Sequence, residues 1–172
     1  MKIAVLSDSH IGQRISVFPK KLLAEIFDYD AIIHCGDFTN IDALNIFKRS
    51  DVLFWGVCGN MDDAEIVAAL PESRIIHIEG IAIGITHGWG SPYSLDERVF
   101  EKMAKNYPDE KFDVIFFGHS HIPSDTFIGG TKMLNPGSVS GNTDEKYGSF
   151  GIFTIENGKI VWEIEKILPK GY

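Results

Sequence analysis

The sequence predicts a mixed α/β protein built on two β-sheets, from three observations. Short apolar runs alternate with amphipathic segments in the first half of the 172-residue chain, the β-α-β pattern of parallel strands buried on both faces. The second half ends in segments that alternate with period two between Gly-rich or Asn-Gly turns, as hairpins do. A content of 44% hydrophobic and 23% charged residues is typical of a globular domain, so we expect one domain over residues 1–172.

The elements of the first half follow from the apolar runs. Pro19 suits the first turn of a helix, where its missing N–H costs no hydrogen bond. The runs before and after Glu79 and Gly80 predict an antiparallel hairpin. We expect strands at residues 2–7, 31–35, 52–58, 74–78 and 81–86, and helices at 19–27 and 41–49.

In the second half, a helical pattern covers residues 95–106 and is followed by the apolar strand "VIFF" at 114–117. The remaining segments alternate in the manner of strands joined by turns. They are "DTFIGG" at 125–130, "TKMLNPGS" at 131–138, "GSFGIFTIENG" at 148–158 and "KIVWEIEKIL" at 159–168.

The formal charge of −8 argues against a broad basic surface, so we expect no long nucleic acid partner. An anionic substrate would instead have to be attracted by bound metal ions. The sequence has no run of about eighteen apolar residues, so we expect no membrane partner. It also begins directly in a predicted strand rather than in a signal peptide, and we therefore expect a cytoplasmic protein.

Cys35 and Cys58 each precede a glycine and a polar residue, which places them at matching positions on neighbouring strands. Their spacing fits neither a zinc motif nor a secreted disulfide framework. We expect two reduced thiols packed near a site, with a disulfide as the minor alternative.

Polar clusters follow five of the predicted buried strands at the point where each strand ends. Ligand sites in open α/β sheets lie at the carboxyl ends of the strands. Mixed oxygen and nitrogen donors without thiolate suit first-row divalent ions, and this number of donors suffices for two ions that share a carboxylate. The candidate metal ligands are Asp8, His10, Asp37, Asn60, His87, His119 and His121.

His119 and His121 stand two residues apart directly after a predicted strand. Residues two apart point to the same side of an extended backbone. If strand geometry persists past Gly118, we expect both imidazoles in one neighbourhood.

Each motif alone also has a structural interpretation. Asp8 to His10 fits a helix-capping turn, Gly36-Asp37 and Gly59-Asn60 fit ordinary turns, and His87 fits a hydrogen-bonded strand end. Their joint occurrence at five successive strand ends favours a functional site.

This order of motifs, Asp-x-His, Gly-Asp, Gly-Asn-x-Asp, His-Gly and Gly-His-x-His, resembles that of the calcineurin-like metallophosphoesterase superfamily. The start "MKIAVLSDSH", with "IIHCGDF" and "LNPGS", is similar to the small bacterial and archaeal phosphodiesterases of that superfamily. The resemblance implies a four-layer αββα sandwich of two mixed β-sheets flanked by helices, with metals between strand ends at one edge.

The resemblance also implies a role for each ligand. Asp37 would bridge two divalent ions, and Asp62 matches an aspartate that orients a neighbouring group, so Asp37, Asn60 and Asp62 are the expected catalytic residues. The turn "NPGS" at 135–138 matches as well, with a fold-stabilising loop as the alternative. The first ion would be held by Asp8, His10, Asp37 and His121, and the second by Asp37, Asn60, His87 and His119.

The expected activity is that of a divalent-metal-dependent phosphoesterase, with a phosphodiesterase favoured. A hydroxide bridging the two ions would attack a small phosphodiester in line, and a nucleotide-like compound is one candidate substrate. Manganese is the favoured metal, with Ni, Co, Fe or Zn as alternatives. The alternative function is a non-catalytic protein-binding scaffold on the same fold, like the retromer subunit. The sequence leaves open whether the chain forms a homo-oligomer.

Two departures from the superfamily pattern bear on the substrate. Met61 stands where many members have a histidine that protonates the leaving oxygen, and a thioether has no proton to give. Trp89 stands where relatives often have histidine. For Trp89 and Tyr93 we favour loop packing over stacking on a base. The loops around Trp89, at 91–93 and at 141–146 should select the substrate.

The remaining histidines need no catalytic role. His34, inside a predicted buried strand, is expected to be a satisfied core residue, with support of Asp37 as the alternative. His77 lies between isoleucines and is expected to face solvent or the other sheet.

Overall fold

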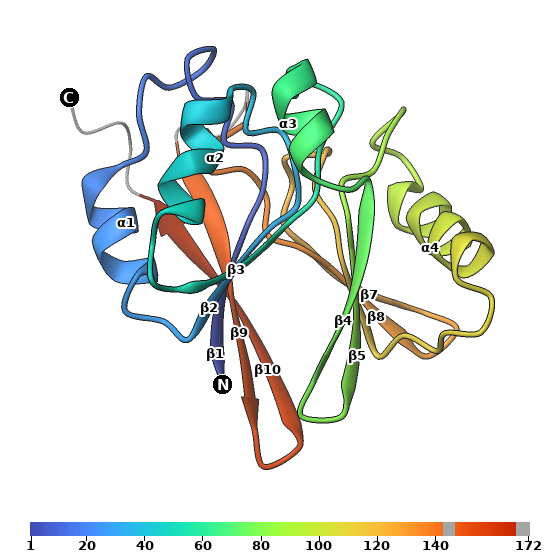
Figure 1. Cartoon of the computed structure of the whole chain (residues 1–172). Coiled ribbons are helices and arrows are strands. Elements are labelled where there is room, and N and C mark those ends of the chain that lie inside the picture. The colour runs from blue at the N-terminus through green and yellow to red at the C-terminus, as the bar shows by residue number, and fades with distance from the viewer. Residues whose placement is uncertain (143–146, 168–172) are drawn as a thin grey trace.

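The computed structural model describes residues 1–142 and 147–167, which form two five-stranded β-sheets placed face to face (Figure 1). The first sheet has the strand order β10-β9-β1-β2-β3, in which β1, β2 and β3 run parallel and β9 runs antiparallel to both β1 and β10. Its strands are β1 (Lys2–Leu6), β2 (Ala31–His34), β3 (Leu53–Gly56), β9 (Gly148–Glu156) and β10 (Lys159–Ile167).

The second sheet has the order β4-β5-β6-β8-β7. β5, β6 and β8 run parallel, while β4 and β7 pair antiparallel at the two edges, so both sheets are mixed as predicted. Its strands are β4 (Ser73–Ile78), β5 (Ile81–Thr86), β6 (Val114–Phe116), β7 (Ser124–Ile128) and β8 (Thr131–Asn135).

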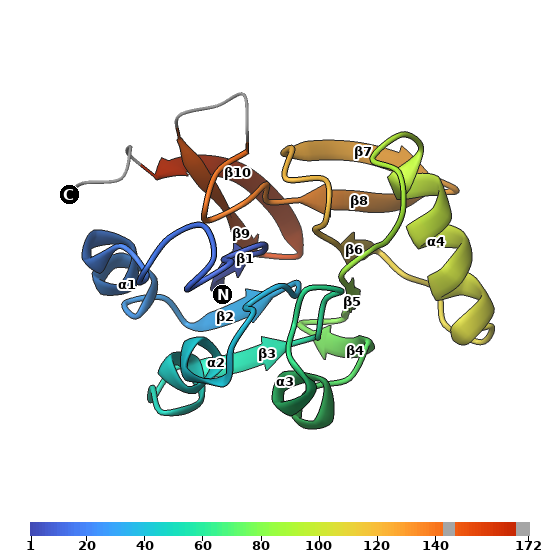
Figure 2. The same ribbon diagram turned by 90° about the horizontal axis from the view of Figure 1, so that it is seen from above.

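Helices cover the outer faces of the sheets, and this confirms the four-layer αββα arrangement (Figure 2). α1 and α2 pack on the first sheet, and α4 packs on the second. α3 belongs to the connection between β3 and β4, which form neighbouring edges of the two sheets. The helices are α1 (Lys20–Ile26), α2 (Ile41–Lys48), α3 (Ala64–Ala69) and α4 (Leu95–Asn106). Among the residues described, no helix is both long and apolar enough to cross a bilayer.

Two helical details differ from the sequence predictions. Pro19 is the N-cap of α1, with φ −56° and ψ 125°, and therefore lies just outside the first turn. α3 is absent from the predicted elements, because six residues are too few to show a helical period. Asp63 starts it by accepting a hydrogen bond from the N–H of Ile66 at 2.9 Å.

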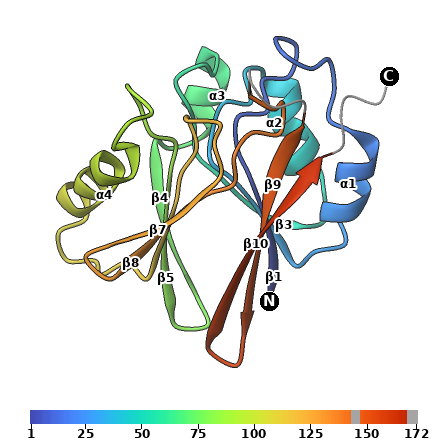
Figure 3. The ribbon, with the colours of Figure 1, turned by 180° about the vertical axis from the view of Figure 1, so that it is seen from behind.

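The core between the sheets is built from the inward faces of both. Phe116 of the second sheet meets Phe153 of the first edge to face, with ring centroids 5.0 Å apart, and both side chains are fully buried. This closed interior fixes the two sheets to each other. The loops after β1, β2, β3, β5 and β6 consequently gather at one edge, at the top of Figure 1 and again in the view from behind (Figure 3).

We expect Phe116→Ala to lower the free energy of unfolding by about 3–5 kcal/mol, because the ring leaves a cavity that neither sheet can fill. Urea unfolding measures this change. Phe127→Ala is the control: its ring on the edge strand β7 is 66% exposed, so the loss should stay below about 1 kcal/mol. Equal losses in the two variants would contradict the role given to Phe116.

Candidate metal centre

Four side chains converge where β1, β2 and β6 end. The Oδ1 atom of Asp8 lies 3.1 Å from Nε2 of His121 and 3.8 Å from Nε2 of His10. The two imidazole nitrogens are 3.2 Å apart. Oδ2 of Asp37 lies 3.6 Å from Nε2 of His10. Two carboxylate oxygens and two ring nitrogens thus face one point.

A second group shares Asp37. Its Oδ2 atom lies 3.3 Å from Nε2 of His87. Oδ1 of Asn60 lies 3.1 Å from that same nitrogen and 2.9 Å from Nδ1 of His119. All seven donors expected from the sequence are therefore brought together, with Asp37 between the two groups. Asp8 also approaches the second group, since its Oδ1 is 3.9 Å from Nε2 of His87.

The two oxygens of the Asp8 carboxylate differ in their hydrogen bonding. Its Oδ2 atom accepts the Ser7 hydroxyl at 2.6 Å and the N–H of His119 at 3.0 Å. Its Oδ1 atom is buried and, within the described residues, accepts no hydrogen bond. A buried carboxylate oxygen without a partner costs free energy, and a cation beside the neighbouring imidazoles would satisfy it. The donors therefore fit a metal ion.

Hydrogen bonds on the far side of two imidazoles set their proton positions. Nδ1 of His87 lies 2.7 Å from the carbonyl oxygen of Cys35, and Nε2 of His119 lies 2.8 Å from that of Gly90. A carbonyl only accepts, so both of these nitrogens carry protons. The opposite nitrogen of a neutral ring then presents a lone pair to Asn60 and Asp37, as metal-ligating histidines do.

The backbone reaches this geometry through left-handed residues. The φ angles are 53° at Asp8, 45° at His10, 59° at Asp37, 70° at His119 and 59° at His121. Positive φ is uncommon outside glycine and clusters at functional sites. Strand geometry does not persist past Gly118, because β6 already ends at Phe116. The condition set for a shared strand face is therefore not met, yet both rings reach the same centre, where each joins a different group.

Two glycines of the motifs leave room for carboxylates. A Cβ atom at Gly118 would lie 1.8 Å from the Ser7 hydroxyl and 2.7 Å from Oδ2 of Asp8. A Cβ atom at Gly59 would lie 2.2 Å from Oδ1 of Asp37. Larger residues would push the carboxylates away from their positions.

Asp62 turns toward the backbone. Its carboxylate accepts the N–H groups of Asp37 at 3.1 Å, Thr39 at 2.7 Å and Gly59 at 2.7 Å. Burial raises its pKa even though these bonds oppose the rise. Asp62 therefore ties the loop after β2 to the loop after β3, in line with the orienting role expected for it.

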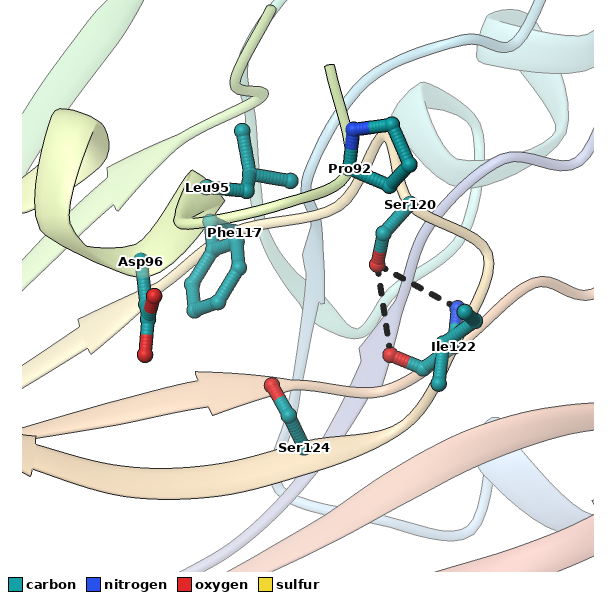
Figure 4. A pocket seen from close by; sticks show the side chains of 7 residues that line it. All are labelled: Pro92, Leu95, Asp96, Phe117, Ser120, Ile122 and Ser124. Carbon is teal, nitrogen blue, oxygen red and sulfur yellow. Dashed lines mark hydrogen bonds between the residues drawn. The ribbon is translucent and has the colours of Figure 1, made fainter.

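The "NPGS" turn also holds ligand loops in place. The Asn135 amide donates to the Gly118 carbonyl at 2.9 Å, and the Ser138 hydroxyl donates to the Asp8 carbonyl at 2.8 Å. These contacts support the fold-stabilising interpretation of the turn. Ser120, between the two histidines in the sequence, lines a pocket of about 170 Å³ beside α4, where its hydroxyl contacts the backbone of Ile122 (Figure 4).

His34 is a satisfied core residue, as expected. It is fully buried, contacts the Ser9 hydroxyl, accepts the N–H of Gly36 and stacks on Phe38 with ring centroids 3.6 Å apart. Burial lowers its pKa to about 3, so the ring is neutral. His77 faces solvent beside Glu110.

The other expectations near the site have mixed outcomes. Cys35 and Cys58 are free and buried, so the disulfide alternative is wrong. The Tyr93 ring is 84% exposed, so the expected packing is wrong for this residue, while Trp89 lies against Lys102. Within the loop 141–146, residues 143–146 lie outside the described residues.

One residue near the centre is missed by the sequence motifs. Nη1 of Arg14 lies 3.0 Å from Nδ1 of His121 and 3.3 Å from the Gly141 carbonyl. A guanidinium only donates, so Nδ1 accepts, and the proton of a neutral His121 lies on Nε2, whose hydrogen-bond partner is Nε2 of His10 at 3.2 Å. No spacing in the sequence marks Arg14, because its contacts join three separate loops.

Charge coupling shifts the pKa values of the buried donors. Burial alone would raise the pKa of Asp8, but His10 and His121 outweigh it and hold the pKa well below its usual value. His87 likewise lowers the pKa of Asp37 against burial. For His87 itself, burial favours the neutral ring, yet Asp37 and Asp8 raise its pKa to about 9.

Comparison with known proteins defines the family. The family model described as "Calcineurin-like phosphoesterase superfamily domain" matches residues 1–158, so the chain belongs to this superfamily of metal-dependent phosphoesterases. More particularly, the chain is 35% identical over 138 residues to a probable metallophosphoesterase of Methanocaldococcus jannaschii, MJ0623, covering 80% of this chain and 68% of that protein. A phosphodiesterase of the same organism, MJ0936, is 26% identical over 157 residues, which cover 82% of this chain and 86% of that protein.

Solved structures confirm the fold. The solution structure of the Thermotoga maritima protein TM1076 is 33% identical, with a TM-score of 0.75 over 96% of this chain and 99% of that one. Wild-type Vps29 of Entamoeba histolytica, solved with Zn²⁺, has a TM-score of 0.74 over 96% of this chain and 99% of that one. At 21% identity, this second likeness shows the fold alone.

The stability of chelator-treated protein should rise as the pH falls from 9 to 6.5. The folded-state pKa of His87, about 9, exceeds its usual value of 6.5, so its stabilising contribution is complete below pH 6.5 and is lost as the pH rises through 9. We expect a slope of about 1 kcal/mol per pH unit in urea unfolding. His87→Gln should remove this slope, and an unchanged slope in the variant would contradict the assignment.

Proposed function

We propose that this protein is a divalent-metal-dependent phosphodiesterase with two metal ions, formed by residues 1–172 acting as one domain. The observation that carries the proposal is that seven donors form two groups with Asp37 between them. One of these donors, Asp8 Oδ1, is buried and accepts no hydrogen bond from the described residues. Separations of 2.9–3.8 Å between donors of the same group suit neighbouring ligands of one ion, because two ligands each about 2.1 Å from an ion lie about 3.0–3.4 Å apart at right-angle to tetrahedral geometry.

The proposed ligands follow the two groups. Asp8, His10, Asp37 and His121 would hold the first ion, and Asp37, Asn60, His87 and His119 the second. When bound, two divalent ions lower the pKa of a water molecule toward roughly 7 and stabilise charge on the phosphoryl oxygens during in-line attack.

The chain's own residues prepare these positions. The N–H of Met61 holds Oδ1 of Asp37 at 2.8 Å, which leaves Oδ2 to face both groups. Ligation through Nε2 of His121 would require its proton to move to Nδ1 and the Arg14 guanidinium to turn away.

Oxygen and nitrogen donors together favour Mn, with Ni, Co, Fe or Zn as alternatives. The proposed substrate is a small phosphodiester, and a nucleotide-like one agrees with the exposed aromatic rings of Trp89 and Tyr93. The chain's net charge of −8 disfavours long nucleic acids.

The free thiols of Cys35 and Cys58 support a cytoplasmic location. The complete donor set favours catalysis over a protein-binding scaffold.

Removal of the shared carboxylate should abolish the paired site. After chelation and reloading with Mn²⁺, the protein should bind two ions and Asp37→Ala at most one, because Asp37 faces both groups. Elemental analysis by mass spectrometry measures this. Asp42→Ala, in the first turn of α2, is the control and should bind two. An Asp37→Ala variant that retains both ions and normal turnover would remove Asp37 from the bridge.

Met61 predicts a preference for diesters with good leaving groups. Metal-loaded protein should hydrolyse bis-p-nitrophenyl phosphate and act little on alkyl monoesters, since loss of a general acid costs about 10²–10⁴ in rate. The Met61 side chain is 47% exposed, so a new imidazole fits there, and Met61→His should raise monoester hydrolysis. Equal turnover of both ester types by the unaltered protein would contradict the preference.

A further inference from the structure

The loop between β5 and α4, residues 88–94, is folded around a single guanidinium group. Arg98 lies in the first turn of α4. Its Nη1 atom donates to the carbonyl of Tyr93 at 2.6 Å and to that of Ser94 at 3.2 Å. Its Nη2 atom donates to the carbonyl of Trp89 at 3.3 Å and also to that of Ser91. One cation therefore binds four carbonyl oxygens of the loop that precedes its own helix.

The shape of this loop depends on that cation. Gly88, Gly90 and Ser94 have positive φ angles of 102°, 79° and 49°. Four carbonyl dipoles directed at one point repel one another unless a positive charge lies between them. Ser94 is the N-cap of α4 and makes no capping hydrogen bond with its side chain, so the usual polar start of a helix is missing here. The guanidinium takes over the task of fixing this turn.

The loop in turn fixes one imidazole of the candidate metal centre. The Gly90 carbonyl lies between two carbonyls that Arg98 binds, those of Trp89 and Ser91, and it faces Nε2 of His119 at 2.8 Å. Because this carbonyl only accepts, it keeps the His119 proton on Nε2 and leaves the lone pair on Nδ1. Nδ1 points at Asn60 Oδ1, 2.9 Å away. In a neutral ring these are two acceptors facing each other, a contact that a shared cation would relieve.

We propose that Arg98 is a positioning residue for the second ion, acting through the Gly90 carbonyl to hold His119 in the tautomer that binds metal through Nδ1. The proposal rests on the proposed function, since it assigns a task toward an ion at His119. It adds a residue outside the metal-ligand motifs, on a helix that contributes no ligand.

The matched control is Lys102, one turn further along α4. Its Nζ atom lies 4.8 Å from the ring centroid of Trp89 and 3.6 Å from a carboxylate oxygen of Glu72. Lys102 thus touches the same loop with the same charge, but through a side chain rather than through the carbonyls. Lys102→Ala should leave His119 unchanged.

The first measurement needs no metal. In long-range ¹H–¹⁵N spectra of chelated protein, assigned with a His119→Gln variant, His119 should show a proton on Nε2. Arg98→Ala should shift a measurable fraction of the ring to the Nδ1–H tautomer, while Lys102→Ala should not. An unchanged His119 tautomer in folded Arg98→Ala would overturn the proposal.

The second measurement is stepwise Co²⁺ binding by calorimetry. Arg98→Ala should weaken one step about 10–100-fold, the usual effect of losing a partner behind a metal ligand, and leave the other within about twofold. Equal weakening of both steps, or of neither, would overturn the proposal. Should Arg98→Ala fail to fold, Arg98→Lys can be used, because it retains the positive charge but not the two nitrogens of the guanidinium. Arg98→Lys should weaken the same Co²⁺ binding step, by a smaller factor. Failure of the unaltered protein to bind Co²⁺ would instead sink the proposed function, while the tautomer measurement would still test the link from Arg98 to His119.

Discussion

The unequal surroundings of the two Asp8 oxygens are the constraint on which the rest of the site depends. One oxygen takes donors from the strand end itself and from the distant His119 backbone, so it ties β1 to the loop after β6. The other oxygen lies beside imidazole rings and, in the described part of the chain, accepts no hydrogen bond. A buried carboxylate oxygen without a donor is costly, and a cation from outside the chain would remove that cost. The neighbouring loops, glycines and turns all act to keep that oxygen and its surroundings in place.

Much of this could be predicted from the sequence, because period and composition report on regular elements. Among the described elements, the strands and the helices α1, α2 and α4 follow from the sequence pattern, and polar residues at strand ends identify the seven donors that converge. These signals are local. Parallel strands bring their carboxyl ends to one edge whatever the loops do, so the neighbourhood of Asp37 and His87 could be expected before its geometry was known.

The remainder depends on features that have no period. The left-handed φ of His119 and His121 belongs to residues whose type does not demand it, so the sequence could not show that strand geometry ends before them. α3 is too short to show a helical pattern. Arg98 binds main-chain carbonyls, which every residue carries, and so no residue type in the loop marks the contact. The resemblance identifies Asp62, but no residue type marks its partners, because they are backbone N–H groups.

The backbone and the side chain of Met61 have different roles. Its amide positions the carboxylate of Asp37, whereas its side chain extends into solvent at the mouth of the centre. Any residue except proline supplies that amide. The choice of reaction can therefore drift in evolution at this residue, one substitution at a time, without disturbing the architecture that holds the donors. The scaffold can therefore acquire new substrates through an exposed side chain that its own stability does not depend on.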